Sequence, residues 1–168
     1  EHRIGLTPES VKVLVERNHE VLVENNGGLE AGFTNQDYLK AGAKIINTSK
    51  EIFKTAELIV KVKEPQLNEI NMIREGQIIY TYLHLAAAKE LTLGLMNSKS
   101  ICIAYETVTD DNGRLPLLAP MSAVAGRMSI QAGAHCLEKN QNGRGLLIGG
   151  APGVDSANVV ILGGGVVG

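Results

Sequence analysis

The stretch from Ile78 to Ala88 decides the fold, and it reads Ile-Ile-Tyr-Thr-Tyr-Leu-His-Leu-Ala-Ala-Ala. Its apolar, β-branched first half predicts a buried strand, and the alanines after the histidine predict the start of a helix. Open α/β sheets bind ligands at the carboxyl ends of their strands, which is where His84 falls. An imidazole titrates near neutral pH and can transfer protons. A histidine at a strand end can equally be a structural residue, so both interpretations stand here.

Similar short strands alternate with short helices on either side of this stretch. We expect strands over 20–23, 43–46, 58–63, 78–83 and 100–105, and helices over 7–17, 38–41, 49–55, 67–73 and 87–97. Most of the strands are apolar on both faces, which is typical of a parallel sheet covered on both sides. The pattern predicts an α/β domain with an open, mostly parallel, Rossmann-like sheet.

The remainder of the chain predicts the start of a second domain. Residues 121–139 have the longest helical pattern, and 157–162 form an apolar run that predicts another buried strand. Gly163-Gly164-Gly165-Val166-Val167-Gly168 then matches G-x-G-x-x-G, in which glycines let the backbone approach a pyrophosphate at a helix N-terminus. The alternative is an ordinary strand-to-helix turn. We expect a first domain over 1–120, a connecting helix over 121–140 and the truncated start of an NAD-binding Rossmann domain over 141–168.

Composition excludes several classes of protein. The 168 residues carry a net charge of −2 and no basic run, which gives no support for a nucleic-acid or membrane partner. Cys102 and Cys136 lie far apart and are typical of reduced thiols in a cytoplasmic protein. No cluster of histidine, cysteine and carboxylate residues has metal-ligand spacing, so no metal site is predicted.

Two cations lie beside apolar segments and could hold an anionic substrate. Arg3 precedes the first predicted helix, and Lys63 closes the strand over 58–63. Each could also be a solvated surface residue. The other histidines, His2, His19 and His135, show no pattern of partners.

Several motifs, in this order, resemble bacterial alanine dehydrogenase over essentially the whole chain. They are Glu-His-Arg-Ile-Gly-Leu-Thr-Pro at 1–8, Lys-Val-Lys-Glu-Pro at 61–65, Tyr-Leu-His-Leu-Ala at 82–86, Tyr-Glu-Thr-Val at 105–108, LPLLAPMSAVAGR at 115–127, Asn-Gly-Arg-Gly at 142–145 and Gly-Gly-Ala-Pro-Gly-Val at 149–154.

The resemblance implies an enzyme that reversibly oxidises L-alanine to pyruvate and ammonium with NAD. Arg3 and Lys63 match substrate-binding positions and His84 matches the acid/base residue. Ser122 matches a residue near the cofactor, as do Gly163, Gly165, Val166, Val167 and Gly168. The family fold has two α/β domains with the active site in the cleft between them. It also implies a homohexamer.

Two features of the family are absent from these 168 residues. A first strand precedes the Glu-His-Arg motif in the family, and most of the NAD domain, with an aspartate that partners the histidine, follows the glycine motif. We therefore expect the chain to be part of a longer polypeptide. Two alternatives remain: the NAD-binding component of a proton-translocating transhydrogenase, which shares the fold, and a non-catalytic α/β module.

Overall fold

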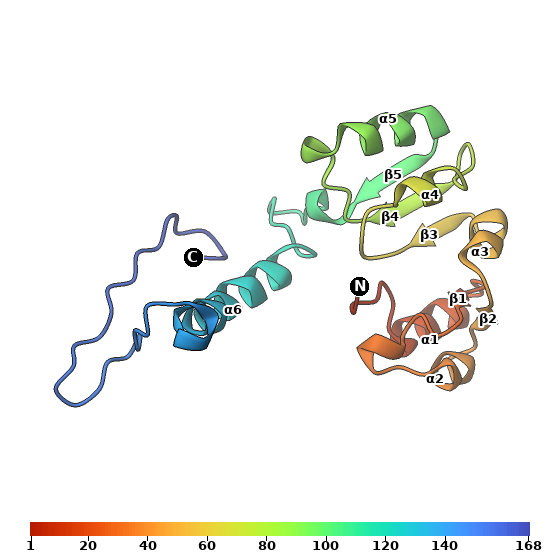
Figure 1. Ribbon diagram of the computed structural model, residues 1–168. Helices are drawn as coiled ribbons and strands as arrows, with labels where there is room; N and C mark the ends of the chain where they lie inside the picture. Colours follow the sequence, from red (N-terminus) through yellow and green to blue (C-terminus); the bar gives the residue numbers. More distant parts are fainter. The chain divides into compact units, whose positions relative to one another are not determined.

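The computed structural model describes residues 1–168, which form two units, Glu1–Val108 and Thr109–Gly168 (Figure 1). The first unit contains every strand. Its elements are α1 (Pro8–Glu16), β1 (Leu22–Glu24), η1 (Leu29–Ala31), α2 (Asn35–Lys40), β2 (Lys44–Ile46), α3 (Ser49–Thr55), β3 (Leu58–Val60), α4 (Leu67–Ile70), β4 (Ile78–Thr81), η2 (Leu85–Ala87), α5 (Lys89–Ser98), β5 (Ile101–Ala104) and η3 (Tyr105–Thr107). The predicted alternation of strands and helices is confirmed.

A two-stranded sheet begins the first unit. β1 and β2 pair in parallel, with Leu22 opposite Lys44, and α1 and α2 pack their apolar side chains around Val11 and Tyr38. The helix starts agree with the sequence: Thr7 Oγ1 accepts the Ser10 N–H at the start of α1. A complete capping box joins the residues at the start of α2, Thr34 and Asp37.

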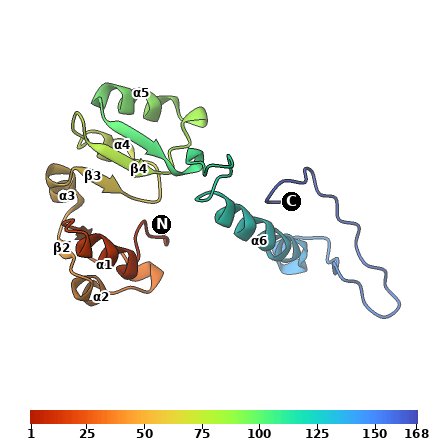
Figure 2. The same ribbon diagram turned by 180° about the vertical axis from the view of Figure 1, so that it is seen from behind.

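A three-stranded parallel sheet in the order β3-β4-β5 forms the rest of the unit. Ile59, Ile79 and Cys102 are aligned across the three strands, and Ile79 is fully buried. Phe53 of α3 packs on Ile59 and Ile79, and Leu91 and Leu95 of α5 pack near Cys102. These helices therefore cover the sheet face that carries Ile79, and Figure 2 shows the same sheet from behind.

The opposite face of this sheet differs from the prediction of a sheet covered on both sides. Leu58, Ile101 and Ile103 point to that face and are 45%, 53% and 42% exposed. The apolar character of the strands is thus satisfied on one face only within the first unit.

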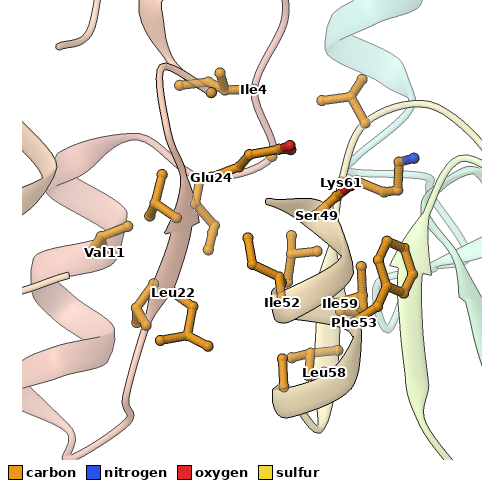
Figure 3. Close-up of a pocket in the computed structure, with 18 of the residues that line it drawn as sticks. Ile4, Val11, Leu22, Glu24, Ser49, Ile52, Phe53, Leu58, Ile59 and Lys61 are labelled. Carbon is orange, nitrogen blue, oxygen red and sulfur yellow. The ribbon is translucent and has the colours of Figure 1, made fainter. Parts of the chain in front are cut away.

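A groove of about 1280 Å³ separates the two sheets where one continuous sheet was expected. β1 and β3 are each the last strand of their sheet, and residues of both line the groove. Figure 3 shows Leu22 and Glu24 on one side and Ile52 and Leu58 on the other. No strand of the chain lies between β1 and β3, which is why the sheet is divided.

The second unit contains α6 (Ala119–Leu137) and η4 (Lys139–Gln141) and no strand. The long helix agrees with the prediction over 121–139, and its role as a connector between domains stays a prediction. The buried strand predicted over 157–162 is wrong: the segment has no strand pairing, and Leu162 is 95% exposed. An apolar run becomes a strand only when a neighbouring strand completes its hydrogen bonds, and this one has no such neighbour. No helix in the structure is long and apolar enough to cross a membrane.

Candidate active site

Three chemically able residues follow the three strands of the larger sheet. Lys63 lies three residues after β3, His84 three residues after β4 and Glu106 two residues after β5. All three strands are parallel, so their carboxyl ends meet at one edge of the sheet. This edge is the usual place of ligand sites in open α/β sheets.

The ends of β3 and β4 are held together by a buried hydroxyl. Thr81 is fully buried, and its Oγ1 lies 2.9 Å from the carbonyl oxygen of Val62 and 2.8 Å from that of Lys63. The Tyr82 N–H also donates to the Val62 carbonyl, at 3.2 Å. The backbone at Lys63 is therefore fixed, while its exposed side chain reaches Glu64 at 3.6 Å.

His84 has an unusual backbone conformation, with φ 49° and ψ 38°. This left-handed region costs a residue with a Cβ about 1 kcal/mol or more. Glu106 offsets that cost: its Oε1 accepts the N–H of His84 at 2.8 Å and that of Leu83 at 3.0 Å. Burial opposes ionisation of Glu106, but these N–H groups outweigh it, and the pKa of the carboxyl is lowered.

Aromatic rings pack beneath His84. The imidazole stacks on Tyr82 with ring centroids 6.0 Å apart and planes 13° apart. Tyr105 meets Tyr80 and Tyr82 edge to face at 4.3 Å and 4.9 Å. Burial raises the pKa of Tyr105 to about 12, so the Tyr105 phenol stays neutral at physiological pH. The rings give the exposed imidazole a rigid support.

Arg3 lies near the same ring cluster. Its charge acts on the hydroxyl of Tyr82, whose pKa is raised chiefly by burial. The guanidinium also forms a two-pronged ion pair with Glu1, with two 2.8 Å contacts, which lowers the pKa of Glu1 to about 2. A guanidinium that donates two hydrogen bonds to this carboxylate has the geometry to donate to the carboxylate of a small acid.

The structure links the predicted residues of the first unit in two ways. Arg3 and Lys63 both line the groove, and Tyr82 connects Arg3, by charge, with His84, by stacking. Their roles toward a substrate stay predictions. Glu106 was missed as a functional residue, although its place just after the strand over 100–105 was a usable signal.

The predicted cofactor residues lie in the second unit. A Cβ on Gly126 of α6 would come within 2.2 Å of the Val167 carbonyl oxygen, so the glycine turn approaches α6 one helical turn after Ser122. Gly163 has φ 98°, and a Cβ on Gly168 would meet the Gly163 carbonyl oxygen at 2.2 Å. Gly164 and Gly165 border open space. The turn requires glycine at its ends and leaves its middle accessible, which fits an anion held by backbone N–H groups.

The structure contains no group of three or more histidine, cysteine or carboxylate side chains arranged to hold a metal ion. The groups singled out above are the imidazole of His84, the cations Arg3 and Lys63, and the carboxylate of Glu106.

Comparison with known proteins identifies the family of this chain. The model of the alanine dehydrogenase/PNT N-terminal domain matches residues 1–125, and that of the C-terminal domain matches residues 129–168. The chain belongs to the alanine dehydrogenase/PNT family.

Individual family members are similar over the full chain. Alanine dehydrogenases from Methanococcus maripaludis and Halomonas elongata are 52% and 53% identical over 168 residues, all of this chain and 45% of each relative. A solved L-alanine dehydrogenase structure is 53% identical and has a TM-score of 0.88, covering 99% of this chain and 46% of its own. The chain thus spans about half the length of the curated relatives it matches.

A second branch of the family is more distant. The crystal structure of a transhydrogenase from Sinorhizobium meliloti is 26% identical, with a TM-score of 0.72, over 82% of this chain and 40% of its own. The fold is shared between the branches, and the identity favours the alanine dehydrogenase branch.

Proposed function

We propose that the whole protein containing this chain is an L-alanine dehydrogenase, which reversibly converts L-alanine, NAD and water into pyruvate, ammonium, NADH and a proton. The observation that carries the proposal is the sheet edge with His84, Lys63 and the nearby Arg3, together with about 50% identity to alanine dehydrogenases. The whole protein would be a cytoplasmic homo-oligomer, a hexamer by the family resemblance.

Arg3 and Lys63 would bind the substrate. The alanine carboxylate suits the planar guanidinium of Arg3, which already donates two hydrogen bonds to a carboxylate in this structure. The compact ammonium of Lys63 would polarise the oxygen of pyruvate as it forms. Both cations line the same groove, which supports assigning both to the substrate.

His84 would move the protons. Oxidation at Cα turns the alanine amine into an iminium, and water must then attack this carbon and lose a proton to a base. The imidazole of His84 is exposed at the sheet edge and held against Tyr82, and it can take that proton and return it in the reverse direction.

The glycine turn, Gly163–Gly168, and Ser122 would hold NAD. When bound, NAD supplies the nicotinamide that accepts the hydride from Cα. The backbone N–H groups at Val166 and Val167 would face the pyrophosphate, since Gly163 and Gly168 shape the turn and its middle is open.

The test is an assay of NADH formation from alanine by the whole protein and by its His84→Ala variant. We expect the variant to lose about a hundredfold or more in kcat, because no base takes the proton, while NAD still binds. His135→Ala is the matched control, since His135 is exposed and pairs only with Glu138 of the same helix end. Loss of NAD binding with normal chemistry would contradict the acid/base role. Hydride exchange between nucleotides without alanine would favour a transhydrogenase.

A further inference from the structure

His84 is unlike the other residues that adopt a left-handed backbone. The other non-glycine residues with positive φ are Asn18, Asn26, Lys99 and Asn142. Lys99 and Asn142 end helices, where this conformation is routine, and asparagine tolerates it well. His84 instead stands between a strand and a one-turn helix. At this place, a contact from outside its own segment supports the conformation.

Glu106 supplies that stabilisation from a neighbouring strand end. Its carboxylate accepts two consecutive backbone N–H groups, those of Leu83 and His84. Glu106 follows His84 by 22 residues in the sequence. Consecutive N–H groups pointing at one oxygen form a small anion-binding concavity, which requires the left-handed turn that His84 makes. The carboxylate and the backbone conformation thus stabilise each other.

The backbone conformation in turn sets the direction of the imidazole. The side-chain vector follows from φ and ψ, and with φ near 49° the ring lies parallel to Tyr82. A different backbone conformation at His84 would change the direction of its Cα–Cβ bond and so move the imidazole relative to Tyr82. Glu106 is half-buried and touches the backbone, so it can control the ring without occupying the place of a substrate.

We propose that Glu106 is a positioning residue, which holds the backbone of Leu83 and His84 so that the His84 imidazole stays in its reactive orientation. The proposal rests on the proposed function, because it assigns to Glu106 control over the orientation of the acid/base residue, His84. Neither the sequence motif nor the predicted site residues gave Glu106 a role.

The experiment uses the whole protein with Glu106→Ala, which removes both acceptors, and Glu106→Gln, which keeps one oxygen but loses the charge. In Glu106→Ala we expect kcat to fall about tenfold to a hundredfold, with KM for NAD within about twofold of the wild type. Glu106→Gln should recover part of the loss. In parallel, amide hydrogen exchange at Leu83 and His84 should accelerate about tenfold or more in Glu106→Ala.

A matched control exists in the second unit. Asp110 Oδ1 also accepts two backbone N–H groups, from Asn112 at 2.9 Å and Arg114 at 2.8 Å, in an exposed turn. Asp110→Ala should speed exchange in its own turn and leave kcat unchanged. Unchanged kcat in Glu106→Ala, or a fall in kcat with normal exchange at 83 and 84, would overturn the proposal. If Glu106→Ala does not fold, the same criteria apply to Glu106→Gln. If the wild type lacks alanine activity, the proposed function fails, and the exchange result still decides whether Glu106 holds the backbone.

Discussion

Two apolar runs of this chain look alike in sequence and differ completely in structure. Ile78–Thr81 forms the central strand of the larger sheet, with neighbours on both sides, whereas Val159–Leu162 stays unpaired and exposed. The difference lies outside both runs: one has parallel strands beside it, and the other has none. An apolar run thus favours a strand, but the strand forms only where neighbouring backbone supplies its hydrogen-bond partners.

The largest expected effect tests this comparison directly. Ile79→Ala in the 168-residue chain should lower the free energy of unfolding by about 2–5 kcal/mol, because the side chain is fully buried. Ile161→Ala should change the free energy of unfolding by less than about 0.5 kcal/mol, because Ile161 is 63% exposed. Urea unfolding followed by circular dichroism measures both. Equal effects would show that residues 159–162 are packed after all.

A smaller effect is expected at the hydroxyl that ties β4 to the end of β3. Thr81→Val keeps the shape but leaves the Val62 and Lys63 carbonyls without this donor, which should cost about 1–3 kcal/mol. Thr55→Val is the control, because Thr55 is exposed at the end of α3. A loss no greater than that of the control would mean that the strand ends do not depend on Thr81.

The smallest effect concerns pH and Glu106. Its folded-state pKa is lowered relative to the unfolded value of about 4.3, so its contribution is complete above that value and is lost as pH falls through the folded pKa. The stability difference between wild type and Glu106→Gln, below about 1 kcal/mol because of solvent screening, should shrink below about pH 4. Urea unfolding of both proteins at about pH 7, 5 and 3, on either side of the unfolded-state pKa, measures this stability difference. A difference that grows on acidification would contradict the sign.

Local signals predicted most of the fold. Thr34 and Asp37 are three residues apart and identify a helix start, and the structure confirms their capping box. Boundaries were predicted less closely: the strand expected over 58–63 ends at Val60, although the Lys61 N–H still donates to the Tyr80 carbonyl and the Tyr82 N–H to the Val62 carbonyl. Proline at 65 signalled that an end was near without fixing it.

Long-range relations were beyond local signals. His84 was identified as a candidate from its place at a strand end, but its left-handed backbone was not, since that conformation depends on Glu106. Which strand lies beside which decides that contact, and the order β3-β4-β5 emerges only from the fold. The exposed apolar face of the sheet was missed for the same reason. The sequence pattern shows which side chains are apolar, but it does not show which element of the fold covers them.

The groove between β1 and β3 has a consequence for how the chain behaves in solution. Each of these strands turns an unpaired edge toward it, and Leu58-Ile59-Val60 carries no charge that would repel another strand. One extended segment laid there could join the two parallel sheets into one. A segment that paired with both edges would leave neither of them available to a strand of another molecule, which is how folded proteins protect strand edges.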